Sequence, residues 1–453
     1  MSKLENLESK DSKKIDYSEI EIMIKDLFEK PMSDLVEFGR ALSIENYQHL
    51  NKHDLIIKII EKKMENLGLS FGGGVLEIME NGFGFLRQSD ANYVKSYKDL
   101  YVPPGHIKSY RLKKGDTVFG FLKEPSEGEK AEKGDKFKAI SEIVLINYTL
   151  ASNIKERKSF DSLTPIYPDF MYNLEDSDNS DMVSTRILNL FAPIGKGQRS
   201  LIVAPPRTGK TILLQNIANA LVKNHPDVYL IVLLIDERPE EVTDMQRSVR
   251  GEVISSTFDE EPDKHCQVAE MVLEKAKRLV ESKIDVVILL DSITRLARAY
   301  NQIVPASGKV LSGGVDAKAL IGPKKFFGAA RNIENGGSLT IIGTALIDTG
   351  SRMDEVIFEE FKGTGNMEVY LDRSLAERRI FPAFDIFKSG TRKEELLINK
   401  NDLEIIWTIR EKLSSNKQDN GAIMKALIDK IKSFKTNKAF LGSIHFNGKT
   451  SVF

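Results

Sequence analysis

Cysteine is almost absent from this 453-residue sequence, which contains only Cys266. One cysteine cannot form a disulfide within the chain, and it cannot supply the paired thiolates of a cysteine zinc site. The sequence also lacks a run of about 18 apolar residues, the length that a membrane-spanning helix needs. The stretch from Met1 to Asn6 has no apolar signal region. These absences lead us to expect a soluble cytoplasmic protein with no membrane partner.

A strong net charge is absent as well, since 65 basic and 66 acidic side chains leave a formal net charge of −1. Bulk positive charge therefore gives no sign of a nucleic-acid partner, and any such binding must come from local sites. A hydrophobic content of 41% and a charged content of 29% are typical of a globular protein. We expect a chain of this length to form two or three domains with at least one large core.

The chain is organised around residues 201–218, where an apolar run, a glycine-containing turn and an amphipathic stretch follow one another. This order predicts a buried strand, a phosphate-binding loop and a helix. Gly209 allows a tight turn that points successive backbone N–H groups at one anion, while Lys210 reaches the β- and γ-phosphates and Thr211 holds Mg²⁺. Ala204 replaces the first glycine of the usual motif. The strand and the helix on either side still favour a nucleotide site over an ordinary structural turn.

Two further apolar runs end in acidic residues. Residues 228–235 lead into Glu237, and residues 285–290 lead into Asp291. Continuous apolar runs are typical of parallel strands buried on both faces, and ligands bind at the carboxyl edge of such sheets. Asp291 is thus placed to bind magnesium as a Walker B acid, and Glu237 to orient an attacking water. The alternative, in which each carboxylate only caps a helix, loses weight because both occur together with Lys210.

The pattern along the chain predicts a multidomain α/β protein. Residues 1–17 are polar and expected to be disordered, residues 18–70 have helical apolar periodicity, and residues 71–148 contain about five short β segments separated by turns. We interpret the last two as a small helical bundle and a five-stranded barrel, most closely an oligonucleotide-binding (OB) fold. A polar linker over residues 149–164 is expected to precede residues 165–453, where strands and helices alternate as in a parallel sheet.

The barrel region contains Gly82-Phe83-Gly84-Phe85. On a strand this spacing puts both phenylalanines on one face, about 7 Å apart, with only glycines between them. Such a surface is suited to stacking unpaired bases, with Arg87 nearby for the nucleic-acid backbone. The alternative is that both rings point into the barrel core, and the pattern alone leaves this open.

Two glycine-containing loops follow Asp291, at residues 305–316 and 348–354, and each carries one cation. Such loops can grip a polymer and move with the hydrolysis state of a nucleotide, although a surface loop or lid is the alternative. Residues 377–382 and 389–395 are dense in arginine. An added arginine, often from another subunit, speeds γ-phosphate hydrolysis, but surface salt bridges explain such arginines equally well.

Several motifs taken together resemble the Rho family of bacterial transcription termination factors. They are Gly82 to Leu86, Gly197 to Arg199, Val203 to Thr211, Asp236 to Thr243, Asp291 to Arg295 and Pro305 to Asp316. The resemblance runs from about Ser33 to Leu397, and the Ala-Pro-Pro start of the phosphate-binding loop is usual in that family. It implies a homohexameric ring with a cold-shock-like RNA-binding barrel and a RecA-like P-loop ATPase domain. The implied activity is that of an RNA-dependent ATPase and 5′-to-3′ helicase, which uses ATP and Mg²⁺, binds nascent single-stranded RNA and dissociates RNA polymerase.

The resemblance assigns roles to single residues. The catalytic set is Glu237, Lys210, Asp291 and Arg392, with Arg392 as the arginine finger. Magnesium is implied at Thr211 and Asp291. The ATP-binding set is Arg207, Thr208, Gly209, Lys210, Thr211, Ile212, Arg238, Arg379 and Phe381, whose ring stacks on adenine. The RNA-binding set is Phe83, Phe85, Arg87, Tyr101 and Phe137 in the primary site, with Lys309, Val310 and Arg352 on the channel loops.

The chain departs mildly from the family pattern. Arg207 and Thr208 stand where lysine and alanine are common, and Arg352 stands where lysine is common. The cations are preserved, but arginine and lysine differ in hydrogen-bonding geometry. We therefore expect contacts with RNA that differ in geometry from those of family members with lysine.

Three other functions fit parts of the pattern. A RecA-like DNA recombinase or replicative helicase would be stimulated by DNA. An RNA-binding module whose nucleotide site only stabilises oligomers would assemble with nucleotide but not hydrolyse it. A rotary ATP synthase subunit shares the motor core but does not explain Phe83 and Phe85.

Overall fold

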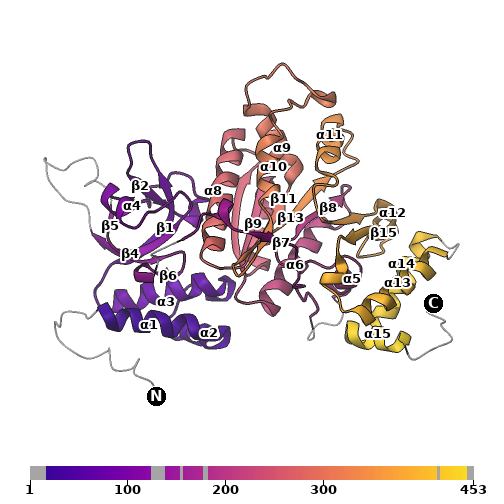
Figure 1. Cartoon of the computed structure of the whole chain (residues 1–453), viewed down its shortest axis with the longest axis horizontal. Coiled ribbons are helices and arrows are strands. Elements are labelled where there is room, and N and C mark those ends of the chain that lie inside the picture. Colours follow the sequence, from indigo (N-terminus) through magenta and orange to yellow (C-terminus); the bar gives the residue numbers. More distant parts are fainter. Residues whose placement is uncertain (1–16, 124–137, 154–156, 177–181, 416–418, 446–453) are drawn as a thin grey trace.

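The computed structural model describes residues 17–123, 138–153, 157–176, 182–415 and 419–445. Figure 1 shows an N-terminal part made of helices and a barrel, a central α/β domain, and a group of helices at the far end of the molecule. The expectation of disorder over residues 1–16 lies outside the described residues, and Tyr17 already begins a helix. None of the described helices is long and apolar enough to cross a lipid bilayer.

The N-terminal helices form the small bundle that the periodicity predicts. Their apolar faces meet at Leu27, Leu35, Leu55 and Ile59, all of which are fully buried. Asn51 caps the third helix, because its side chain accepts a hydrogen bond from the backbone N–H of Asp54 at 2.9 Å. The helices are α1 (Tyr17–Glu29), α2 (Met32–Ala41) and α3 (Lys52–Asn66).

The following segment is a closed barrel of the expected type. Strands β3, β2, β1, β4 and β5 are neighbours in that order, and the parallel pairing of Tyr101 with Ala139 joins β3 to β5 and closes the barrel. Alternate residues such as Leu76, Leu86 and Val118 fill its interior. The elements are β1 (Phe71–Ile78), β2 (Gly84–Arg87), β3 (Leu100–Val102), α4 (Pro104–Ser109), β4 (Thr117–Lys123), β5 (Ala139–Ile146) and β6 (Thr149–Leu150).

The segment expected to be a polar linker is partly built into the fold. Strand β6 continues the barrel sheet to Leu150. Phe160 is buried, and its backbone N–H donates to Glu281 of the central domain at 2.8 Å. Two short 3₁₀ turns, Ala151–Asn153 and Phe160–Ser162, occupy the connection. The chain therefore packs along the domain boundary, which the polar composition did not indicate.

The central domain is built on one sheet with the order β10-β9-β11-β13-β8-β14-β15, in which only β15 runs antiparallel to its neighbour. The strands of this path are β8 (Arg199–Ala204), β9 (Tyr229–Glu237), β10 (Glu252–Thr257), β11 (Val286–Asp291), β13 (Ser338–Leu346), β14 (Met367–Leu371) and β15 (Phe384–Thr391). Two short strands, β7 (Pro165–Ile166) and β12 (Arg331–Ile333), pair with each other beside β13.

Helices cover both faces of this sheet. Along β8, Leu201 and Val203 belong to the core beneath α8 and α9, whereas Ile202 and Ala204 belong to the core beneath α5 and α6. This alternation is why the strands read as unbroken apolar runs. The helices are α5 (Val183–Phe191), α6 (Lys210–Asn224), α7 (Pro239–Ser248), α8 (Pro262–Glu281), α9 (Ile293–Ile303), α10 (Ile321–Gly328), α11 (Arg352–Phe361), α12 (Arg373–Glu377), α13 (Lys400–Ser415), α14 (Asn420–Lys432) and α15 (Asn437–His445).

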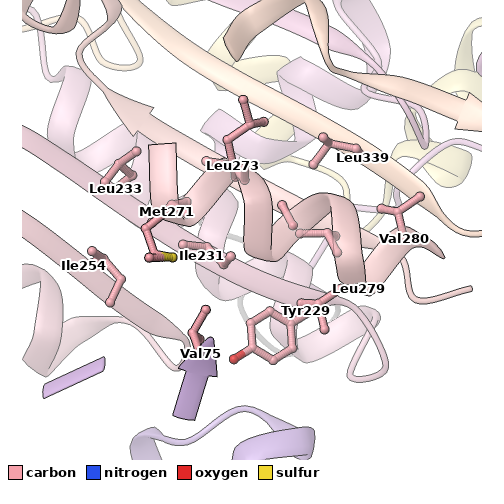
Figure 2. Close-up of a cluster of buried hydrophobic side chains, with 14 of the residues drawn as sticks. Val75, Tyr229, Ile231, Leu233, Ile254, Met271, Leu273, Leu279, Val280 and Leu339 are labelled. Atoms are coloured by element: carbon pink, nitrogen blue, oxygen red, sulfur yellow. The ribbon is translucent and has the colours of Figure 1, made fainter. Parts of the chain in front are cut away.

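The core beneath α8 extends into the N-terminal part. Figure 2 shows Met271 of α8 beside Ile231 of β9, while Val75 of barrel strand β1 approaches the ring of Tyr229. The barrel and the central domain thus share one continuous hydrophobic core.

A buried polar cluster lies at the same boundary. Lys275 of α8 donates to Glu252 of β10 at 2.6 Å and to the hydroxyl of Tyr229 at 2.8 Å. It also donates at 3.0 Å to Tyr93, which belongs to the barrel and itself donates to Glu252. Asp54 of α3 accepts a hydrogen bond from Tyr229 at 3.2 Å. The cluster therefore joins the N-terminal helices, the barrel and the central domain.

We expect Lys275→Met to lower the free energy of unfolding by about 3–5 kcal/mol, because Glu252 is then buried without its cation. Urea denaturation followed by circular dichroism measures the loss. The matched control is Lys324→Met, which breaks a surface pair with Glu360 at 2.6 Å and is expected to cost less than about 1 kcal/mol. Equal losses in the two variants contradict a special role for the buried pair.

Candidate functional site

The predicted phosphate-binding loop joins β8 to α6. The hydroxyl of Thr208 donates to the carbonyl of Pro205 at 2.8 Å and closes the turn. Gly209 has a φ of 85°, a left-handed conformation that suits glycine. Helix α6 begins at Lys210, and the first N–H groups of a helix, which have no partner within it, suit an anion. Thr211 lies half-buried in the first turn of this helix.

The structure brings together the lysine and the two acids that the sequence singled out. Lys210 forms an ion pair with Asp291, and its Nζ lies 3.5 Å from Oε1 of Glu237. The carboxylates end the neighbouring strands β11 and β9, which pair Asp291 with Leu234. Thr344 of β13 donates to Asp291 at 2.8 Å and fixes its orientation. The carboxyl edge of the sheet therefore holds one cation between two acids.

Neither acid serves as a helix cap. Ser292 caps α9, because its hydroxyl accepts from the backbone N–H of Arg295 at 3.2 Å. The residue that precedes α7 is Arg238, which follows Glu237. The helix-cap alternative for the two acids is therefore wrong.

Burial raises the pKa of Glu237, and the nearby charge of Asp291 raises it further, while Lys210 and Arg295 act in the opposite direction. Arg295 of α9 lies 3.7 Å from Glu237 and 3.3 Å from Asp236. A carboxylate with a raised pKa is a better proton acceptor than an exposed one. In the sequence, Arg295 appears only as the end of the motif Asp291 to Arg295 and has no role of its own; its position four residues after Asp291 is the signal that could have identified it.

The oxygen atoms of Thr211 and Asp291 suit Mg²⁺, which prefers hydroxyl, carboxylate, water and phosphate ligands. The described part of the chain contains no cluster of three or more acidic, histidine or cysteine side chains that could enclose a metal.

A cavity of about 250 Å³ lies beside the loop. Ile212 and Phe381, which are 63% and 46% exposed, form part of its wall. The ring of Phe381 lies 3.6 Å from the point where a Cβ on Gly209 would be. Flat apolar walls of this kind suit a nucleotide base. Sequence reasoning missed three polar residues of the wall, because they come from α5, the middle of α6 and α14: Ser184, Asn216 and Lys432.

The structure places the predicted arginines in two groups. Arg207, Arg238 and Arg379 have exposed side chains and belong to segments that form the site: the phosphate-binding loop, the end of β9 and the approach to Phe381. Arg392 is also exposed and directly follows Thr391, the last residue of β15. Thr391 pairs with Met367 of β14, which in turn pairs with Ser200 near the start of β8. Arg392 therefore lies at the opposite edge of the sheet from its own phosphate-binding loop.

On the barrel, the aromatic side chains form an outward-facing group. The ring centroid of Phe83 lies 5.8 Å from that of Phe85 and 5.7 Å from that of Tyr101, and the centroids of Phe85 and Tyr101 are 6.1 Å apart. All three residues are half-buried. Gly84 and Leu86 face the other way and are buried. The alternative that the two phenylalanines fill the barrel core is therefore wrong. Phe137 lies outside the described residues.

Arg87 lies behind this aromatic group. It is 6% exposed, donates to Glu77 at 2.7 Å and forms an ion pair with Asp99. Its guanidinium lies 5.3 Å from the centroid of Phe85. Two carboxylates already neutralise this cation, which counts against the expected contact with an RNA phosphate. In this structure, Arg87 supports the ring of Phe85.

The two predicted loops lie side by side. A Cβ on Gly313 would lie 2.7 Å from the backbone oxygen of Arg352, so the loop over residues 305–316 fits closely against the start of α11. Asp316 accepts from the backbone N–H of Ser307 at 2.7 Å and gives this loop a defined shape. Lys309, Val310 and Arg352 are all exposed, and Figure 1 shows a loop projecting beyond α9 and α11.

Sequence models of protein families match successive parts of the chain. The N-terminal domain of the Rho termination factor matches residues 26–68, and its RNA-binding domain matches residues 72–151. The nucleotide-binding domain of the ATP synthase alpha/beta family matches residues 184–391. Among solved structures, an ATPase from the type III secretion system of pathogenic bacteria has a TM-score of 0.52 at 20% identity. That similarity covers 64% of this chain and 90% of the other, and it shows the fold alone.

Curated relatives match almost the whole chain. Transcription termination factor Rho of Pseudomonas fluorescens biotype C is 54% identical over 422 residues, which are 93% of this chain and 99% of that protein. The factor of the same name from Salmonella typhimurium is 52% identical over 418 residues, 92% of this chain and 98% of that protein. With matches of this extent, and with the barrel and phosphate-binding loop in place, the chain belongs to the family of transcription termination factor Rho.

Proposed function

We propose that this chain is an ATP-hydrolysing RNA translocase and 5′-to-3′ helicase that forms a homohexameric ring. It binds nascent single-stranded RNA and terminates transcription in the cytoplasm by dissociating RNA polymerase. The observation that carries the proposal is the placement of Lys210 against Asp291 and Glu237, in a chain whose barrel presents Phe83, Phe85 and Tyr101 to solvent. Membership of the Rho family supports it.

In this proposal the residues of the carboxyl edge divide the work of hydrolysis. Lys210 and the N-terminus of α6 bind the phosphates of ATP, and a bound Mg²⁺ would neutralise the charge that develops on them. Thr211 and Asp291 hold the metal. Glu237 accepts a hydrogen bond from the attacking water and orients it toward the γ-phosphate. Phe381 and Ile212 contact the base.

The link from hydrolysis to RNA movement runs through α9. This helix begins two residues after Asp291 and leads to the loop over residues 305–316, which carries Lys309. Arg298 of α9 donates to Asp354 of α11 at 2.7 Å and ties the two loop-bearing helices together. A change at the catalytic edge therefore has a rigid path to both loops.

Lys210→Ala is expected to lower RNA-stimulated ATP hydrolysis by roughly 100-fold or more, because the γ-phosphate loses its main side-chain cation. Phosphate release is measured with poly(C), poly(U), poly(A) and single-stranded DNA at one stated salt concentration. Lys324→Ala, a surface lysine away from the site, is the control. Hydrolysis that survives in Lys210→Ala rules out this site, and stimulation by DNA but not RNA favours the recombinase or replicative-helicase alternative.

Phe83→Ala and Phe85→Ala are each expected to weaken RNA binding by roughly 5- to 150-fold, because base stacking contributes about 1–3 kcal/mol per base. Fluorescence anisotropy with a labelled pyrimidine oligonucleotide measures the dissociation constant, and the salt dependence is recorded in parallel. Tyr97→Ala is the matched control, since Tyr97 is a 90% exposed aromatic residue of the same barrel outside the aromatic group. If Phe83→Ala and Phe85→Ala bind RNA as tightly as Tyr97→Ala, bases do not stack on Phe83 and Phe85.

Mixing two inactive variants tests whether Arg392 acts on a neighbouring subunit. Arg392→Ala keeps its own phosphate-binding loop, and Lys210→Ala keeps its arginine, so a mixed ring contains some complete sites. We expect each variant alone to hydrolyse little ATP and the co-assembled mixture to regain part of the activity. Arg373→Ala, which breaks an exposed pair with Glu377, should remain active alone. A mixture that co-assembles but stays inactive contradicts a shared site.

A further inference from the structure

The last residue of helix α14, Lys432, belongs to the wall of the cavity beside the phosphate-binding loop. It lies beyond residue 391, where the match to the nucleotide-binding domain ends. Its side chain is exposed and makes no ion pair or hydrogen bond with any residue that the structure describes. A lysine at such a wall is a cation that a bound molecule can use.

Helix α14 is firmly anchored, so the position of Lys432 is defined by packing. Leu427, Ile428 and Ile431 on its inner face are buried in the same core as Leu213 and Ile217 of α6. That core also contains residues of α5. Around the start of α5, Met182, Val183 and Ser184 belong to the cavity wall. The C-terminal helices therefore form one side of the nucleotide cavity.

The remaining wall is largely apolar and suits the faces of a base. It includes Ile212, Leu371, Phe381 and Pro382, whereas Lys210 is not part of it, which places the cavity on the base side of the loop. The polar pair of the wall is already engaged, since the side-chain amide of Asn216 donates to the hydroxyl of Ser184 at 2.9 Å. The ring nitrogens of a purine are hydrogen-bond acceptors, and the ammonium group of Lys432 supplies unused donors.

We propose that Lys432 donates a hydrogen bond to a ring nitrogen of the purine of the bound nucleotide. It thereby acts as a base-contacting residue that the C-terminal helices contribute to the site. The proposal rests on the nucleotide site of the proposed function. It adds a contact that lies outside the phosphate-binding loop and its two acids.

Lys432→Met removes the donor and retains the length of the side chain. We expect the KM for ATP to rise by roughly threefold to tenfold with kcat unchanged, as for the loss of one charge-assisted hydrogen bond in a partly solvated site. Lys432→Arg should restore most of the affinity. Lys430→Met is the matched control, because Lys430 is exposed on the same helix and does not line the cavity. An unchanged KM in Lys432→Met overturns the proposal.

Two further measurements separate the base from the phosphates and from hydrolysis. Inhibition by inorganic tripolyphosphate should be equal in the wild-type protein and in Lys432→Met, because tripolyphosphate has no base. If Lys432→Met loses tripolyphosphate inhibition to the same extent as it loses ATP affinity, Lys432 contacts the phosphates and the base contact is overturned. Isothermal titration calorimetry with ADP should show the same weakening as the KM. If the wild-type protein binds ADP but hydrolyses no ATP, the proposed function fails, while weaker ADP binding in Lys432→Met still supports this contact.

Discussion

The ion pair between Lys210 and Asp291, with Glu237 alongside, is the interaction on which the rest of the site depends. Two acids at the ends of neighbouring strands repel each other, and burial makes that repulsion more costly than it is in water. Lys210 keeps both acids in place. If a bound triphosphate attracts Lys210, Asp291 loses its cation, and a divalent metal held by Asp291 and Thr211 would replace that positive charge. Nucleotide and Mg²⁺ are therefore expected to bind together.

The same sheet connects the catalytic edge to both surfaces that we assign to RNA. Strand β9 ends at Glu237 and begins at Tyr229, which hydrogen-bonds to Asp54 and Lys275 in the cluster at the barrel boundary. The barrel that carries the aromatic group is thus attached to the start of β9 through Tyr93, which accepts a hydrogen bond from Lys275. The loops over residues 305–316 and 348–354 follow α9 and β13 at the other end. Close packing of these elements leaves few ways for the edge to change without moving the loops.

Local patterns predicted the parts of the fold that depend on local chemistry. The unbroken apolar runs before Glu237 and Asp291 and the turn at Gly209 were confirmed, because burial on both faces and a left-handed glycine leave a signature within a few residues. The pairing of Lys275 with Glu252 could not be predicted, since it joins separate elements and appears in sequence only as two ordinary charges. Arg87 shows the same limit: its proximity to Phe85 in sequence suggested a free cation, whereas residues 77 and 99 neutralise it.

The position of Arg392 follows from strand direction. In a parallel sheet all phosphate-binding elements gather at the carboxyl edge, and the antiparallel strand β15 carries its last residue back to the other edge. A side chain there cannot reach the loop after Ala204 in its own chain. It can reach a nucleotide only if the amino edge of one subunit's sheet faces the carboxyl edge of the next subunit's sheet. That contact is head-to-tail, and head-to-tail contacts close into rings when the rotation between copies allows it. If Arg392 acts as the arginine finger, the direction of β15 requires a head-to-tail arrangement of subunits, and the proposed hexameric ring supplies one.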